Sequence, residues 1–338
     1  MDAPSRFSLR LKAFIYRRLT VVFSALDRYL SSPLPRQASF EKSIPSTVSK
    51  TRGSIRLLFY TPKSFVRTHS ASSGAVQGKK YPVLVNFHGG GFCIGNPQDD
   101  ARWATAVTEA QEAVVVSVGY RLAPEYPFPV AIDDGVDAIL WIWEHADDLN
   151  LDRTRIALSG FSAGGNLSLT VALRLHEVVQ KRMPTAEIQL VGIVAFYPSV
   201  DWTQTRAERT ASNLISAEKS PIPEGLFKFF DASYLYPQPI DMGSPYLSPG
   251  LASEELLVAA LPDRLMVYSC EWDQLLVETE KFRKRLQELG KKVGGRIVLG
   301  EAHAWDKRPS FMKGDKKRDQ VYAESTAELG KMWQTATR

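Results

Sequence analysis

The chain has 338 residues, of which 44% are hydrophobic and 23% charged, and this composition excludes wholesale disorder. At this length about three quarters of the surface of the unfolded chain can be buried, so stability requires neither a metal nor disulfides. The two cysteines, Cys93 and Cys270, exclude a disulfide scaffold and a zinc cluster with four thiolate ligands. The net charge of +5 is mild for this length, which argues against a nucleic-acid-binding protein.

Basic residues and a helical stripe of apolar side chains mark the N-terminal segment. The stripe consists of Leu11, Ile15, Leu19, Val22, Leu26 and Leu30. The longest uncharged stretch, residues 19–26, is far shorter than the ~20 residues that cross a bilayer, and no convincing cleavage site follows it. We therefore predict an amphipathic helix packed on the body of a cytoplasmic protein. A basic presequence or a helix bound to a membrane surface is an alternative that we favour less.

Short apolar runs alternate with helical patterns through the middle of the chain. The predicted strands cover residues 55–60, 83–87, 114–118, 156–159, 190–196, 265–269 and 296–299. The predicted helices cover residues 98–112, 131–149, 163–181 and 278–289. Strands and helices that take turns imply βαβ units and a mostly parallel sheet. The active site of such a sheet lies in the loops beyond the carboxyl ends of the strands.

One strand is followed by Gly160-Phe161-Ser162-Ala163-Gly164 and then by a long helical pattern. This is the G-x-S-x-G pattern in its strand–turn–helix context, where a tight turn presents the serine Oγ at the top of the sheet. Side chains at the two glycines would collide within such a turn. The pattern by itself is weak, and a serine in an ordinary glycine-rich turn is the alternative; no Gly-Lys-Ser/Thr continuation supports a phosphate loop.

Another apolar strand is followed by His88-Gly89-Gly90-Gly91-Phe92. Consecutive glycines after a buried strand cost stability unless another group must approach the backbone closely. Acyl transfer has that need, because bare N–H groups of Gly89 and Gly90, with that of Ala163, could stabilise a developing oxyanion. A flexible turn is the alternative. Together, this HGGG-type motif and the later G-x-S-x-G motif are typical of esterases with the α/β-hydrolase fold. We expect His88 to brace the loop.

The serine, the acid and the histidine occur in that order in this fold. Of the two histidines after Ser162, His176 is fourteen residues along the helix, about 21 Å away at ~1.5 Å per residue. His303, in a strand-end loop, is therefore the predicted base. Asp273 is the predicted acid, since it follows the preceding strand. Glu271 is the nearest competitor.

These motifs resemble those of the hormone-sensitive lipase family of α/β-hydrolases, from about residue 55 to 310. The resemblance also rests on Tyr120-Arg121-Leu122-Ala123-Pro124, Pro127-Phe128-Pro129, Asp133-Asp134, Ser244-Pro245 and Ser248-Pro249. We interpret the Tyr120–Pro129 segment as structural, with Arg121 paired to Asp133 or Asp134. Two departures from the family are Ala302 and Gln274, where a proline is common beside the catalytic histidine and after the aspartate.

The resemblance implies one α/β domain over residues 1–338, with an eight-stranded sheet flanked by helices. It also implies a helical cap built from about residues 1–50 and 200–243. We expect the substrate pocket to include Phe92, Phe161, Trp202 and Phe230.

The predicted activity is hydrolysis of small carboxylic esters of short to medium acyl chain through an acyl-enzyme. An alternative is a biosynthetic thioesterase, acyltransferase or deacetylase that uses the same triad on a specialised metabolite. A binding protein on this fold is disfavoured, because serine, acid and histidine are all present. We infer no cofactor and no metal, and the sequence gives no indication of the oligomeric state.

Overall fold

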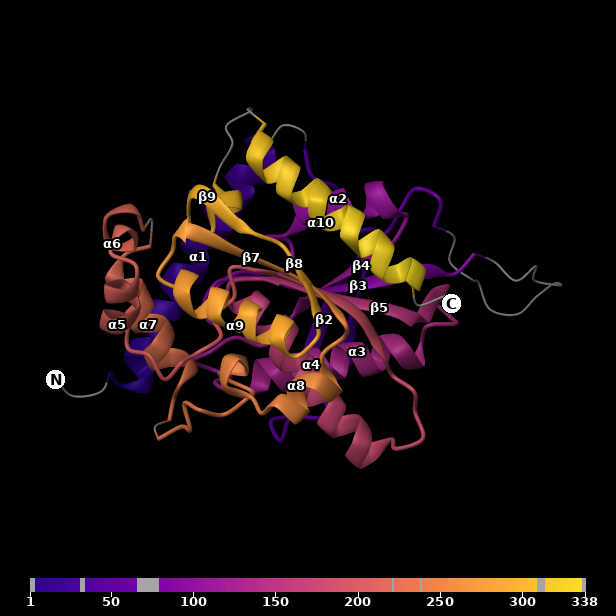
Figure 1. Ribbon diagram of the computed structural model, residues 1–338, viewed down its shortest axis with the longest axis horizontal. Coiled ribbons are helices and arrows are strands. Elements are labelled where there is room, and N and C mark those ends of the chain that lie inside the picture. Colours follow the sequence, from indigo (N-terminus) through magenta and orange to yellow (C-terminus); the bar gives the residue numbers. More distant parts are fainter. Residues whose placement is uncertain are drawn as a thin grey trace.

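A nine-stranded sheet forms the centre of the computed structural model (Figure 1), which describes residues 4–30, 34–65, 79–220, 222–237, 239–308 and 314–335. The strand order is β1-β2-β4-β3-β5-β6-β7-β8, and β9 also pairs with β7. Strand β2 is antiparallel to β1 and β4, and the remaining pairs are parallel. The strands are β1 (Phe40–Pro45), β2 (Ser54–Tyr60), β3 (Tyr81–Phe87), β4 (Val114–Gly119), β5 (Leu151–Phe161), β6 (Leu190–Phe196), β7 (Arg264–Trp272), β8 (Lys292–Gly294) and β9 (Ile297–Ala302).

Helices cover both faces of this sheet. Figure 1 shows α10 and α2 on one side, and α3, α4, α8 and α9 on the other. Helices α5, α6 and α7 gather at one end of the molecule. The helices are α1 (Arg6–Leu30), α2 (Ala101–Gln111), α3 (Val130–Glu144), α4 (Ala163–Arg182), α5 (Arg206–Ser212), α6 (Ile215–Lys219), α7 (Glu224–Tyr234), α8 (Glu254–Ala260), α9 (Leu276–Glu288) and α10 (Lys316–Thr335).

Successive side chains of the central strands enter two separate apolar cores. In β3, Val83, Val85 and Phe87 pack with α3 and α4, while Leu84 packs with α2 and α10. A strand that is buried on both faces needs apolar residues at every position, not at alternate ones. The continuous apolar runs in the sequence therefore arise from helical cover on both sides, and the predicted mostly parallel sheet is confirmed.

The sheet extends beyond the predicted strands at both edges. Strand β1 has the sequence FEKSIP with exposed charged residues, and β8 has three residues, so neither is an apolar run. Strand β1 also corrects the expected cap boundary near residue 50. Residues 40–45 pair with β2 and belong to the sheet, so only the chain before them is available to a cap.

The N-terminal helix α1 packs on the body of the protein, but not through the predicted apolar stripe, because Leu11, Ile15, Leu19, Val22 and Leu26 of that stripe are about half exposed. Its Leu9 and Ala13 are buried, and the ring of Tyr16 lies 5.1 Å from that of Phe229 in α7. Arg17 donates hydrogen bonds to the carbonyl oxygens of Cys93 and Ala123. Among the described residues, no helix has the length and apolar character needed to cross a membrane.

The segment after β4 is fixed by a buried ion pair. Arg121 donates from Nε and Nη2 to both carboxylate oxygens of Asp134, at 2.9 and 2.6 Å, and its side chain is 6% exposed. Asp133 instead pairs with Arg174 of α4. The structure thus selects Asp134 from the two partners that the sequence left open, and it gives the Tyr120–Pro129 segment a structural role.

Candidate functional site

A tight turn between β5 and α4 places Ser162 at the carboxyl edge of the sheet. Ser162 has φ 55° and ψ −114°, a conformation that is rare for a residue with a side chain. A Cβ at Gly160 would lie 2.0 Å from the carbonyl oxygen of Gly164, and one at Gly164 would lie 1.9 Å from that of Phe87. Only glycine fits at these two positions, so the two glycines of the motif are required by the geometry of the turn.

His303 and Asp273 lie beside this serine. The Nε2 atom of His303 is 2.7 Å from Ser162 Oγ, and its Nδ1 atom is 2.6 Å from Asp273 Oδ2. Both side chains are buried, and the second carboxylate oxygen of Asp273 accepts the N–H of Leu275 at 3.0 Å. Three loops that are far apart in the sequence, after β5, β7 and β9, therefore bring these three side chains into one hydrogen-bonded row.

The competing residues have other partners. Glu271 accepts the N–H of Gly300 at 2.6 Å, and His176 lies 2.9 Å from the amide of Gln180 on the outer part of α4. Asp306 accepts hydrogen bonds from the hydroxyls of Tyr197 and Tyr322. Burial opposes ionisation of Asp306, but Lys307 and these hydroxyls hold its pKa below the ordinary value.

The glycine loop after β3 packs against the serine turn. A Cβ at Gly89 would lie 3.1 Å from the carbonyl oxygen of Phe161, and Gly90 has φ +108°, which favours glycine. Gly89, Gly90 and Ala163 all line the cavity beside Ser162. In the part of the chain that the structure describes, no acceptor is found for the N–H groups of these three residues. An N–H group can stabilise an oxyanion only if no other acceptor already occupies it.

His88 braces this loop from beneath. Its ring stacks on that of Tyr120 with centroids 4.3 Å apart, and its Nδ1 atom is 2.7 Å from the carbonyl oxygen of Gly89. The Tyr120 hydroxyl also donates to the His88 carbonyl at 2.8 Å. Burial lowers the pKa of His88, although Asp99 opposes this effect. His88 is therefore a poor candidate for the base, as the sequence indicated.

A mainly apolar cavity of about 440 Å³ opens beside Ser162. All four expected pocket residues, Phe92, Phe161, Trp202 and Phe230, line it. Phe92 and Phe161 also belong to the apolar core. The centre of the Phe92 ring lies 3.8 Å from that of Tyr234, and the centre of the Phe161 ring lies 4.4 Å from that of Phe196. Cavity-lining residues outside that expectation include Thr20, Phe23, Ser24, Tyr197, Leu226, Phe227 and Leu275.

A partly buried lysine that the motifs did not predict joins two loops of the site. Lys307 Nζ lies 2.7 Å from Asp100 Oδ1 and 3.1 Å from Asp306 Oδ2, and 3.3 Å from the centre of the Phe161 ring. Burial disfavours the ammonium, but Asp100 and Asp306 outweigh it and raise the pKa of Lys307. The charged lysine ties the loop after β9, which carries His303, to the start of α2.

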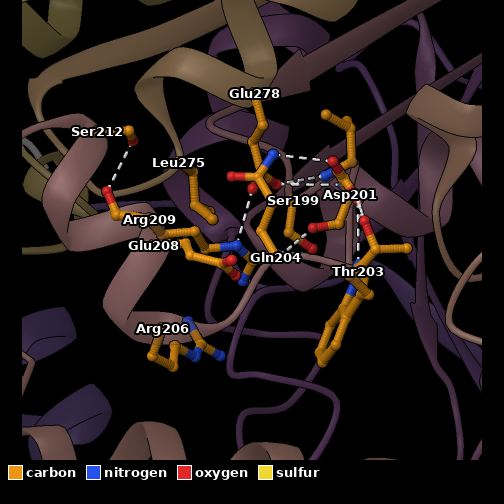
Figure 2. A network of polar contacts seen from close by, with 12 residues as sticks. Ser199, Asp201, Thr203, Gln204, Arg206, Glu208, Arg209, Ser212, Leu275 and Glu278 are labelled. Atoms are coloured by element: carbon orange, nitrogen blue, oxygen red, sulfur yellow. Dashed lines mark hydrogen bonds and ion pairs between the residues drawn. The ribbon is translucent and has the colours of Figure 1, made fainter.

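A buried ion pair ties α5 to α9, the helix that follows Asp273 (Figure 2). Arg209 Nε of α5 lies 2.8 Å from Glu278 Oε2 of α9, with side chains 3% and 2% exposed. Glu278 Oε1 also accepts the N–H of Val200 at 2.8 Å. Asn213, just after α5, donates from Nδ2 to the carbonyl oxygens of Glu271 and Asp273, both at 2.9 Å. The segment with α5, whose Arg206 and Arg209 line the cavity, thus holds the backbone of Asp273.

Neither cysteine is a candidate nucleophile. Cys93 and Cys270 are free and fully buried, and burial raises the pKa of both thiols. A buried thiol with a raised pKa is largely protonated and unreactive. Among the described residues, no group of three His, Cys, Asp or Glu side chains is arranged to hold a metal ion.

Residues 84–307 match the family described as the alpha/beta hydrolase fold. Carboxylesterase 20 of Arabidopsis thaliana is 30% identical over 290 residues, which are 83% of this chain and 84% of that protein. An arylesterase of Saccharolobus solfataricus is 30% identical over 224 residues, 66% of this chain and 68% of the arylesterase.

Solved esterase structures also superpose on this chain. EstE1, a thermostable carboxylesterase from a metagenomic library, superposes with a TM-score of 0.76 at 26% identity, covering 95% of this chain and 98% of EstE1. An esterase of Pyrobaculum calidifontis superposes with a TM-score of 0.73 at 25% identity, covering 98% of this chain and 92% of the esterase. The chain belongs to the α/β-hydrolase fold family and, within it, to the carboxylesterases that resemble hormone-sensitive lipase.

Proposed function

We propose that this protein cleaves carboxylic esters of short to medium acyl chain, with Ser162 as nucleophile, His303 as general base and Asp273 as its orienting acid. One observation carries the proposal: Ser162 Oγ, the imidazole of His303 and the Asp273 carboxylate form a row with contacts of 2.7 and 2.6 Å. A serine hydroxyl is a weak nucleophile until an adjacent base accepts its proton. The row supplies that base and holds it in the required orientation.

The reaction divides into two half-reactions. Ser162 Oγ attacks the ester carbonyl carbon while His303 Nε2 takes the hydroxyl proton, and the carbonyl oxygen becomes an oxyanion. The oxyanion accepts hydrogen bonds from the N–H groups of Gly89, Gly90 and Ala163, each worth about 3–4 kcal/mol. The imidazolium then protonates the leaving alcohol as the C–O bond breaks. A water molecule, deprotonated by His303, attacks the acyl carbon; the bond from that carbon to Ser162 Oγ then breaks, and the imidazolium returns the proton to Oγ as the acid leaves.

The lining of the cavity favours an uncharged acyl group of limited size. Its walls are mainly apolar and enclose about 440 Å³. Three basic residues of the lining already have carboxylate partners, since Arg206 pairs with Asp231, Arg209 pairs with Glu278, and Lys307 pairs with Asp100 and Asp306. An acyl chain of moderate length can fill this space, whereas an ionised group would leave water for an apolar wall.

Replacing Ser162 by alanine should lower kcat for a nitrophenyl ester by about 10⁶-fold, because the hydroxyl that forms the acyl-enzyme is removed. The matched control is Ser168→Ala on the same helix, whose Oγ donates only to the Gly165 carbonyl at 2.8 Å. This control should keep most of its turnover. Substantial turnover by Ser162→Ala would exclude Ser162 as the nucleophile.

Asp273→Asn should lower kcat by about 10⁴-fold, since an amide can hold the imidazole in the wrong tautomer and cannot stabilise the imidazolium. Glu271→Gln is the control only two residues away. Its carboxylate accepts the Gly300 N–H, and an amide oxygen can replace it there. Steady-state kinetics of both variants decides the assignment. If Glu271→Gln fell as far as Asp273→Asn, the orienting role of Asp273 would be lost.

A panel of nitrophenyl esters should show the highest kcat/KM between acetate and medium-chain acyl groups, because longer chains exceed the cavity. A clear preference for emulsified triolein would contradict the proposed chain length.

The same acyl-enzyme should partition to water in the presence of added alcohols and thiols. Partitioning mainly to alcohol or thiol would replace the hydrolase by an acyltransferase.

A further inference from the structure

Helix α1 is apolar on two opposite faces. The inner face packs on the body through buried Leu9 and Ala13, and Arg17 pairs with Glu125 at 2.8 Å. At 100° per residue, the opposite face carries a second set of large apolar side chains. These are Phe7 (77% exposed), Leu11 (51%), Phe14 (56%), Ile15 (48%), Leu19 (50%), Val22 (56%), Leu26 (50%) and Tyr29 (83%).

Single exposed apolar residues are ordinary, but a contiguous row of them marks an interaction site. We therefore expect the outer face of α1 to bind a partner, and the charges around this face indicate the chemical class of that partner.

The borders of this outer face are basic. Exposed Arg10 and Lys12 flank the apolar row on its two sides, whereas exposed Arg18 lies within the row, with its guanidinium 5.1 Å from the centre of the Phe14 ring. The sequence holds no acidic residue between residues 6 and 26, whereas Arg10, Lys12 and Arg18 lie on or beside this face. A second copy of the chain paired across a twofold axis would bring like charges together. An anionic lipid surface would neutralise them.

We propose that α1 docks the protein on anionic membranes, with its outer apolar face inserted at the level of the headgroups. The inner side of the same helix borders the cavity through Thr20 and Ser24, and Arg17 holds the carbonyl of Cys93 beside the glycine loop. In Figure 1 α1 runs beside α7, which also lines the cavity. Docking would thus place the cavity next to the bilayer, where lipophilic esters concentrate. Binding to the membrane is independent of whether Ser162 is the nucleophile.

Co-sedimentation of the full chain with phosphatidylcholine vesicles, with and without phosphatidylserine, tests this. Binding should require phosphatidylserine and weaken as salt rises. The double variant Leu11→Ser/Phe14→Ser should lose most of its binding. The matched control Val258→Ser/Leu299→Ser, at sites 50% and 64% exposed on other elements, should bind as the unmodified chain does. Arg10→Gln/Lys12→Gln should lower affinity for the anionic vesicles by about fivefold per charge.

All variants should keep their turnover of a soluble nitrophenyl ester and their circular dichroism, which shows that they are folded. For a variant that fails this check, Ile15→Thr is the milder replacement on the same face. The proposal is overturned if the unmodified chain does not bind anionic vesicles, or if the Val258/Leu299 control loses as much binding as the Leu11/Phe14 variant. It is also overturned if light scattering without lipid finds a dimer that Leu11→Ser/Phe14→Ser dissociates, because a second copy would then cover this face.

Discussion

The site depends on how closely the serine turn packs against the end of strand β3. Gly164 leaves no room for a side chain beside the Phe87 carbonyl, and Gly89 packs on the carbonyl of Phe161. These contacts hold the serine turn and the glycine loop at a fixed separation. A fixed separation matters because oxyanion donors stabilise a transition state only when they are in place before the reaction. The strained conformation of Ser162 is maintained by the sheet and helix on either side of it.

Buried charges fasten the remaining loops to this centre. Lys307 lies between Asp100 and Asp306, and Arg209 lies against Glu278. Removing one partner of the Arg209–Glu278 pair, whose side chains are 3% and 2% exposed, leaves an uncompensated buried charge, which typically costs about 3–5 kcal/mol. The loops that carry His303 and Asp273 are therefore attached to neighbouring elements by interactions that resist separation. Asn213 and the Arg209–Glu278 pair join the segment with α5 to the loop that carries Asp273 and to α9.

The sequence predicted the parts of the molecule that local patterns encode. Apolar runs identified the buried strands, the two glycine motifs identified the loops at Ser162 and Gly89, and chain order led to His303 and Asp273. The sequence did not predict the edge strands β1 and β8, because β1 is partly exposed and β8 has only three residues. The pairing of Lys307 with Asp100 and of Arg209 with Glu278 could not be predicted, since ion pairs between distant segments leave no periodic signal. For α1 the sequence indicated one apolar stripe, whereas only the structure separates an inner face from an exposed outer one.

The central claim is that these loops form one preorganised acyl-transfer site. The most direct measurement is a crystal structure of the protein after reaction with a phosphonate ester, whose tetrahedral phosphorus resembles the intermediate of acyl transfer. The account predicts a covalent bond to Ser162 Oγ and a phosphonyl oxygen within hydrogen-bond distance of the N–H groups of Gly89, Gly90 and Ala163. An adduct on another residue, or a phosphonyl oxygen turned away from these donors, would contradict it.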